Sequence, residues 1–257
     1  MGVPWSWELG EGAVVATAIH SGHELRPEVA ARMALDDATR RREEDPFTDR
    51  WVAVAPTRLV VHRSRFEVDL NRPRDGAVYR RPADAWGLRV WRSPPPPELV
   101  ASSLALWDAF HREARAVLAE RIARHGRVVV LDLHAYNHRR HGAAGPAAQA
   151  AGNPTVNLGT GSLPRQRWAR VVEACLAALR GAPLRGRPLD VAENVRFQGG
   201  HFPQWVHESF PGTACALALE VKKVFMDEWT GEADSAAIAE LGAALAAAAR
   251  AVEAASA

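Results

Sequence analysis

The sequence predicts an α/β fold: a single domain with a mostly parallel (mixed) sheet flanked by helices. Three runs, at residues 13–19, 128–133 and 215–221, are almost wholly apolar, as expected of strands that are buried on both faces. Helix-forming segments separate these runs along the chain, and such alternation is typical of a parallel sheet. The 257 residues suffice for one large domain, and no long polar linker interrupts them, so we expect one domain over residues 1–257.

The remaining elements follow in chain order. A helical segment at residues 27–44 comes after the first strand, and residues 51–55 and 58–70 have the apolar or alternating patterns of further strands. The proline run at residues 93–100 predicts a turn that also starts a helix, because proline is tolerated in a first helical turn and Glu98 suits the positive end of the helix dipole.

That helix extends to residue 125, and two more helical segments occupy residues 165–180 and 234–255. The last of them has Asp234 or Ser235 as its N-cap and is rich in good helix formers. Residues 141–154 are mostly small, and they form either a plain surface loop or a mobile loop over a site.

Composition restricts the classes of partner. The formal net charge of +2 does not favour nucleic acid or a membrane surface, and no apolar run approaches the ~20 residues that span a bilayer. The N-terminus lacks the pattern of a signal peptide, and Cys175 and Cys215 form no CxxC pair, which fits a reducing compartment. We therefore expect a soluble cytoplasmic protein. The oligomeric state cannot be read from the sequence.

Polar chemistry gathers at the ends of the three apolar runs. His20 follows the first, His134 ends the second, and Glu220 lies in the third. In parallel sheets ligands bind at the carboxyl ends of the strands, so these side chains meet if their strands are neighbours. Imidazole and carboxylate are ordinary ligands of zinc, and a further carboxylate beside the zinc-bound water is a candidate general base. The alternative is a set of hydrogen-bonded structural residues. Asp132 either accepts a hydrogen bond from a ligand histidine or makes a purely structural hydrogen bond.

The segment from residue 64 to residue 81 is rich in arginine and also contains Asn71 directly before Arg72. Arginine binds carboxylates through two parallel hydrogen bonds, so this segment is a candidate for holding a substrate carboxylate. The alternative is a row of salt bridges along a sheet edge.

Taken in order, these motifs resemble the N-formylglutamate amidohydrolase (deformylase) family, which is related in fold to zinc carboxypeptidases. The resemblance spans most of the chain. It is carried by "AIHSGHELRP", "DPFTDRW", "SRFEVDLNR", "VLDLHAYNHR", "VNLGTGS", "VRFQGGH" and "LALEVKKVFMDE".

The resemblance implies a phosphorylase/hydrolase-like fold and one Zn²⁺ per chain. His20 and His134 would be two of the zinc ligands. The family's Asp-Thr-Asp-Trp segment makes Asp49 the preferred carboxylate ligand, although Phe47 departs from that pattern. The pattern of zinc carboxypeptidases instead favours Glu24.

The same resemblance implies roles for the other motifs. Glu220 would be the general base. The remaining residues would bind the substrate or shape its pocket, and they are Arg65, Asn71, Arg72, Asn157, Gly159, Gly199, Gly200 and His201.

The expected activity is zinc-dependent hydrolysis of the amide bond of an N-acyl (N-formyl) amino acid such as N-formylglutamate. Two alternatives stand beside it: a metal-free binding or regulatory protein on a degenerate amidohydrolase scaffold, and a zinc hydrolase of another N-acyl amino acid or a small peptide. Loops determine which acyl group and which amino-acid side chain of the substrate are accepted, so the sequence does not distinguish between these substrates.

Overall fold

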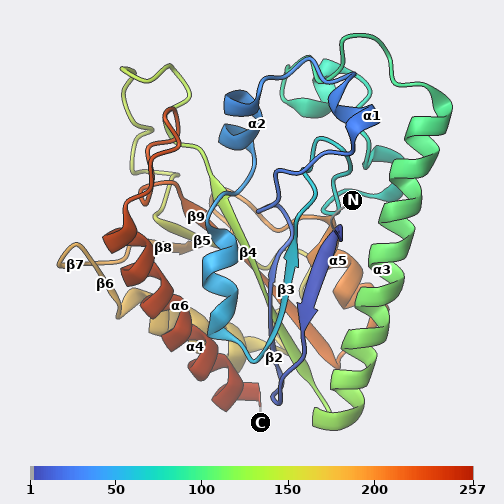
Figure 1. The fold of residues 1–257 in the computed structure, drawn as a ribbon. Helices are drawn as coiled ribbons and strands as arrows, with labels where there is room; N and C mark the ends of the chain where they lie inside the picture. The colour runs from blue at the N-terminus through green and yellow to red at the C-terminus, as the bar shows by residue number, and fades with distance from the viewer. Residues whose placement is uncertain (1–2, 257) are drawn as a thin grey trace.

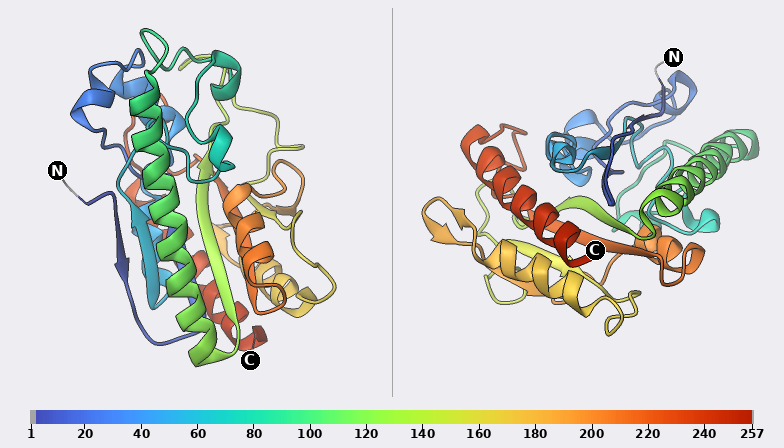
Figure 2. Two further views of the ribbon diagram at one scale, coloured as in Figure 1. Left: turned by 90° about the vertical axis from the view of Figure 1, so that its right-hand side faces the viewer. Right: turned by 90° about the horizontal axis from the view of Figure 1, so that it is seen from below.

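A seven-stranded mixed sheet lies between two layers of helices in the computed structural model, which describes residues 3–256 (Figures 1 and 2). The strand order is β1-β3-β2-β4-β9-β5-β8. The strands are β1 Trp5–Glu8, β2 Val14–Ala18, β3 Thr57–Val61, β4 Val128–Tyr136, β5 Val156–Gly159, β8 Val191–Glu193 and β9 Ala214–Lys222. A short separate hairpin pairs β6 Pro183–Leu184 with β7 Arg187–Pro188. The expectation of one domain also covered residues 1, 2 and 257, which lie outside the described part.

The centre of the sheet is parallel. Strands β3, β2, β4 and β9 run in one direction, whereas β1 pairs antiparallel with β3, and β5 pairs antiparallel with β9. The predicted mostly parallel, mixed sheet is therefore confirmed. The three apolar runs are β2, β4 and β9, and they are direct neighbours. Because parallel strands end at the same edge of the sheet, the polar residues at their carboxyl ends are brought together.

Helices cover both faces of the sheet (Figure 2). On one face, α4, α6 and the 3₁₀ helix η1 pack against the strands, and on the other face α3 and α5 do so. The helices are α1 Pro27–Ala30, α2 Asp37–Glu43, η1 Thr48–Val54, η2 Arg74–Gly76, η3 Pro82–Ala85, α3 Pro97–His125, α4 Ala169–Arg180, α5 His201–Ser209 and α6 Ser235–Ser256. The proline turn does start α3, and Asp234 accepts a hydrogen bond from the backbone of Ala237 at the start of α6.

Three predicted elements were wrong. Residues 51–55 fall mostly in η1 instead of a strand, because Trp51 packs into the core and donates its Nε1–H to the carbonyl of Ile238 in α6 at 3.0 Å. Of the run 58–70, only the start is strand, and the rest is a buried loop that carries charged side chains. The segment 27–44 is broken into two short helices, α1 and α2.

The C-terminal helix α6 also corrects an expectation. By length and composition it is apolar enough to cross a membrane, whereas we expected no such run from the sequence. Its alanines, however, pack against α4 and η1, and 44% of the apolar window is buried inside the protein. This packing is that of a core helix in a folded domain.

Candidate active site

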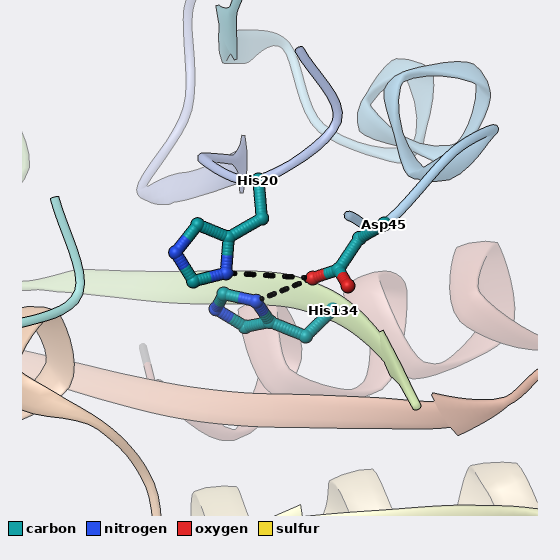
Figure 3. Close-up of side chains that lie close together, drawn as sticks. All are labelled: His20, Asp45 and His134. Carbon is teal, nitrogen blue, oxygen red and sulfur yellow. Dashed lines mark hydrogen bonds and ion pairs between the residues drawn. The ribbon is translucent and has the colours of Figure 1, made fainter. Parts of the chain in front are cut away.

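Three potential metal ligands converge at the carboxyl edge of the central strands (Figure 3). His20 follows β2, His134 lies on β4, and Asp45 lies in the connection between α2 and η1. All three side chains are buried. Their ligand atoms lie within 4.8 Å of one another, a spacing that a single metal ion can bridge.

The carboxylate of Asp45 joins the two imidazoles. Its Oδ2 lies 2.9 Å from Nδ1 of His134 and 3.5 Å from Nδ1 of His20. The backbone adds a further constraint, because the N–H of Asp45 donates to the carbonyl of His20 at 3.0 Å. Burial opposes ionisation of Asp45, but the hydrogen bonds to His134 and His20 outweigh it and hold the pKa of the carboxyl below its usual value. Asp45 is therefore an anion at neutral pH.

The outer nitrogen of each histidine is held by a second, fully buried carboxylate. Nε2 of His20 lies 2.7 Å from Oδ1 of Asp69, and Nε2 of His134 lies 2.9 Å from Oδ2 of Asp132. Thr17 donates its hydroxyl to the other oxygen of Asp132 at 2.7 Å. A carboxylate at Nε2 would keep a proton there when a metal ion replaces the proton on Nδ1, so that each Nδ1 could give its lone pair to the ion. This arrangement suits a divalent metal.

The structure corrects the predicted carboxylate of this cluster. Asp45 occupies the position that we expected of Asp49, with Glu24 as the alternative. Asp49 and Glu24 are exposed, and both line a different cavity of about 330 Å³. The physical reason is the turn at Phe47, whose backbone is left-handed (φ 71°) and separates buried Asp45 from the exposed first turn of η1.

A buried lysine that sequence reasoning missed anchors the loop of Asp45. Lys223 is almost wholly buried, and its Nζ donates to the carbonyls of Arg42 and Glu44 and to Oδ1 of Asn137, at 2.6, 2.7 and 2.9 Å. The Glu44 carbonyl belongs to the peptide bond that precedes Asp45. Burial lowers the pKa of Lys223, while the charge of Asp45 acts in the opposite direction. Lys223 thus ties the end of β9 to the loop that carries Asp45.

Glu220 lies directly beside His134 in the sheet. It pairs with His134 across β4 and β9 and with Asn157 across β9 and β5. Burial raises the pKa of Glu220 to about 7, with His134 opposing the shift and Asp45 adding to it. A carboxyl group of that pKa exchanges protons readily near neutral pH, as a general base requires.

A cavity of about 410 Å³ opens over these residues. It is lined by His20, Asp45, His134 and Glu220 and also by Arg65 and Asn71. Arg65 is held by Asp69, to which its guanidinium donates at 2.8 Å. Although burial opposes ionisation, the Arg65 charge and His20 hold the pKa of Asp69 well below its usual range. Asp69 therefore links His20 to an arginine of the cavity wall.

The other predicted binding residues are placed differently. Arg72 donates to the carbonyl of Asp84 at 3.0 Å and is not among the residues that line the cavity. Asn157 holds the loop of residues 194–200 by hydrogen bonds, and His201 stacks on Trp107 at a ring separation of 5.9 Å, so neither of them reaches the cavity.

The glycine pair lies at the wall of the cavity. Gly199 and Gly200 both line the cavity. A Cβ on Gly200 would lie 2.3 Å from Nδ2 of Asn71, so no larger residue fits there unless Asn71 moves. Asn71 in turn accepts the backbone N–H of Phe202 at 2.8 Å, which ties the arginine-rich segment to the start of α5.

Two further arginines of the cavity wall, Arg140 and Arg196, were not among the predicted site residues. Arg196 lies in the motif "VRFQGGH" and Arg140 directly follows "VLDLHAYNHR", but neither motif marks which arginine faces the cavity. Trp86, from the turn after η3, also lines the wall and stacks with the guanidinium of Arg65 at 4.9 Å.

Fold and site together define an α/β protein whose cavity holds a His-Asp-His cluster with a carboxyl group of raised pKa beside it. The family model for N-formylglutamate amidohydrolase matches residues 12–226, which is most of the chain, and the protein belongs to that family. It is thereby a hydrolase that acts on amide bonds.

Solved structures agree with the fold. The N-formylglutamate amidohydrolase from Ralstonia eutropha JMP134 superposes with a TM-score of 0.76 at 18% sequence identity, over 97% of both chains. The gene product Atu2144 from Agrobacterium tumefaciens superposes with a TM-score of 0.68 at 18% identity, over 95% of both chains. No curated protein sequence matches the chain.

Proposed function

We propose that the protein is a zinc-dependent amidohydrolase that cleaves the amide bond of an N-acyl amino acid, with N-formylglutamate as the model substrate. The observation that carries the proposal is the juxtaposition of His20, Asp45 and His134 with Glu220 in one cavity. The family to which the chain belongs supports the reaction class and the formyl group. A cytoplasmic location is part of the proposal, supported by the two buried free cysteines.

The donor set supports zinc as the metal. Two imidazole nitrogens and one carboxylate oxygen are the ligands of a catalytic zinc, which keeps a further position for water or substrate. His20, His134 and Asp45 would hold the ion, and Asp69 and Asp132 would orient the imidazoles. When bound, the metal supplies Lewis acidity, which polarises the carbonyl and makes water a better nucleophile.

The residues of the chain carry the proton and position the substrate. Glu220 takes a proton from water as the new C–O bond forms at the amide carbon, and it returns that proton to the leaving nitrogen as the C–N bond breaks. The products are a carboxylic acid and a free amine. Arg65 and Asn71 hold the carboxylate of the amino acid, which places the scissile bond over the metal site.

The test combines metal analysis with a substrate panel. Purified protein is expected to contain about one zinc per chain and to release free amine from N-formyl amino acids faster than from N-acetyl amino acids or dipeptides. A preference for another acyl group or for dipeptides supports a zinc hydrolase of different specificity. Absence of both bound zinc and turnover indicates a binding protein on this scaffold, and it overturns the proposal.

Glu220→Gln tests the assigned base directly. The variant is expected to bind zinc and to melt like the wild type, while kcat falls by roughly 10²- to 10⁴-fold, because the amide keeps the shape of the side chain but cannot accept the proton. Glu220→Asp, which retains the carboxylate, serves as the matched control and should recover part of the rate. Near-normal kcat in Glu220→Gln would remove Glu220 from this role.

A further inference from the structure

Trp86 differs from the other residues that line the cavity over Glu220, because its ring is exposed and its backbone is strained. The side chain is 50% exposed, and the backbone is left-handed, with φ 54° and ψ 28°. A bulky L-residue adopts this conformation only at a conformational cost, whereas glycine adopts it freely. Within residues 3–256, Trp86 belongs to none of the three hydrophobic clusters. Core packing therefore does not explain why a tryptophan occupies this turn.

The turn that carries Trp86 is held in place by its neighbours. The N–H groups of Trp86 and Gly87 both donate to the carbonyl of Pro82, and the bond from Gly87 is 2.8 Å long. The carbonyl of Asp84, in the same turn, accepts a hydrogen bond from the guanidinium of Arg72 at 3.0 Å. Strained backbone persists where surrounding contacts fix it, and such positions cluster at functional sites. The indole ring thus has a defined position beside the arginine-rich segment.

The indole ring covers the guanidinium of Arg65, which is already held along one edge. Nε of Arg65 donates to the hydroxyl of Tyr79 at 3.2 Å, and Nη2 donates to Oδ2 of Asp69 at 2.8 Å. The guanidinium carbon lies 4.9 Å from the centroid of the Trp86 ring. Nη1 of Arg65 donates to no acceptor in the part of the chain that the structure describes. Two hydrogen bonds and one aromatic ring therefore hold the group, and Nη1 is left for a ligand in the cavity.

The ring changes how strongly Arg65 binds an anion. An aromatic ring beside a guanidinium stabilises the charge and displaces water from it. The attraction between the guanidinium and a carboxylate is stronger where water is removed. The ring also restricts a long side chain, so less entropy is lost when a ligand binds. Buried Tyr79 meets the Trp86 ring edge-on, with the ring centroids 6.0 Å apart, and so supports the ring from the side of the core.

We propose that Trp86 is a positioning residue, which holds the guanidinium of Arg65 so that Nη1 meets the carboxylate of the amino acid. The inference rests on the proposed binding of that carboxylate by Arg65, and it adds the residue that makes Arg65 an effective partner. The left-handed backbone and the exposed ring of Trp86 then have a functional reason, because both are needed to place an aromatic face at the cavity wall.

The kinetic test compares two substrates that differ by one charge. N-formyl-L-glutamate and its α-amide, N-formyl-L-isoglutamine, both release formate, which is measured. Trp86→Ala should raise KM for N-formyl-L-glutamate on the order of 3- to 30-fold and leave kcat within about threefold. For the α-amide, KM and kcat should both stay within about twofold of the wild-type values. An unchanged KM for N-formyl-L-glutamate, or an equal rise with both substrates, would overturn the proposal.

Three further variants separate the role of the ring from its effect on stability. Trp86→Phe keeps an aromatic face and should restore most of the wild-type KM. Trp86→Gly should be more stable than Trp86→Ala, because glycine relieves the backbone strain, yet it should raise KM as much. A KM that follows the Tm of these variants would mean a purely structural role. Trp5→Ala, on edge strand β1 and outside the cavity lining, should leave KM unchanged.

A double-mutant cycle tests whether Trp86 acts through Arg65. Arg65→Gln alone should raise KM for N-formyl-L-glutamate, because the guanidinium that binds the carboxylate is gone. Adding Trp86→Ala to Arg65→Gln should then change KM by less than about twofold. If the two effects multiply instead, Trp86 does not act through Arg65 and the proposal fails. Arg65→Lys keeps a charge beside Asp69 and provides a second cycle if Arg65→Gln does not fold.

A binding measurement separates this proposal from the proposed activity. N-methanesulfonyl-L-glutamate carries the same carboxylates but has a sulfonamide that is not cleaved, and it is titrated calorimetrically beside its α-amide. Trp86→Ala should weaken binding of the carboxylate form and leave that of the α-amide unchanged. If no substrate is hydrolysed but this selective loss is found, the activity fails and the role of Trp86 stands. If Trp86→Ala and the wild type bind the carboxylate form equally, the role of Trp86 fails.

Discussion

Replacement of Asp45 by Asn tests the geometry of the metal site most directly. The substitution keeps the size of the side chain but removes the negative charge that lies 2.9 Å from Nδ1 of His134 and 3.5 Å from Nδ1 of His20. Asp49→Asn and Glu24→Gln are the matched controls, because these carboxylates were the candidates that sequence reasoning favoured and both are exposed in the structure.

The expected loss of zinc affinity in Asp45→Asn follows from the role of Asp45 in the cluster. Loss of a residue that merely orients a metal ligand typically lowers metal affinity 10- to 100-fold. Asp45 is itself one of three ligands and the only anionic one of the described cluster, so its loss should cost more than about 100-fold, which corresponds to more than ~2.8 kcal/mol. The two control variants should bind zinc like the wild type.

Zinc affinity is measured by competition with a chromophoric chelator, and zinc content by elemental analysis of the purified proteins. Thermal unfolding gives a second readout, since free zinc at about 1,000 times its Kd stabilises the native state by ~4 kcal/mol. Added zinc should therefore raise the Tm of the wild type and of both controls, but much less that of Asp45→Asn. Stoichiometric zinc in Asp45→Asn, or its loss in Asp49→Asn, would refute the assignment.

Two predictions concern buried cations and imidazoles. Lys223→Met should lower the free energy of unfolding by about 3 kcal/mol and weaken zinc binding, because two carbonyls lose their buried donor and the peptide before Asp45 is released. Burial lowers the pKa of His111 from 6.5 to about 4, so the unfolded chain binds the proton more readily between these values, and stability should fall by up to roughly 3 kcal/mol as the pH drops from 6.5 to 4. Denaturant titrations of the chelator-treated protein measure the two changes in stability, and the chelator competition measures the zinc affinity of Lys223→Met.

Each of these predictions has its own control. Lys223→Arg retains a donor and should keep part of the zinc affinity, whereas an unchanged affinity in Lys223→Met would show that Lys223 does not position Asp45. His111→Phe removes the titrating imidazole, which donates to the carbonyl of Trp107 at 3.0 Å, and keeps an aromatic ring. The stability difference between wild type and His111→Phe should shrink or reverse toward acid pH, and a difference that is constant with pH would contradict the assignment.

The local residue pattern was sufficient to predict the fully buried strands and the long helices. Strands β2, β4 and β9 are continuous apolar runs because side chains on both of their faces are covered, and α3 and α6 are long enough for helix signals to accumulate. Pattern failed at residues 51–55, where a short apolar run fits a strand and a helical turn equally well. The contact of Trp51 with α6 decides between them.

The carboxylate ligand shows why part of the site could not be read from the chain. Asp45 and Asp49 are four residues apart, and both are followed within two residues by an aromatic or cationic side chain. Their environments diverge only because the backbone turns at Phe47 and because Lys223, far along the sequence, holds the preceding carbonyl. A residue pattern that extends over a few positions does not predict a contact with a residue far along the chain.

The sequence by itself determined that His20, His134 and Glu220 lie on or just after three buried strands, because hydrophobic runs and their polar ends are local properties. It also indicated the family, through the order of its short motifs. Only the tertiary structure decided that Asp45 completes the cluster, that Asp69 and Asp132 orient the imidazoles, and that Arg196 faces the cavity in place of Arg72. These choices depend on contacts between segments far apart in the chain, and such contacts exist only once the sheet has brought its strand ends together.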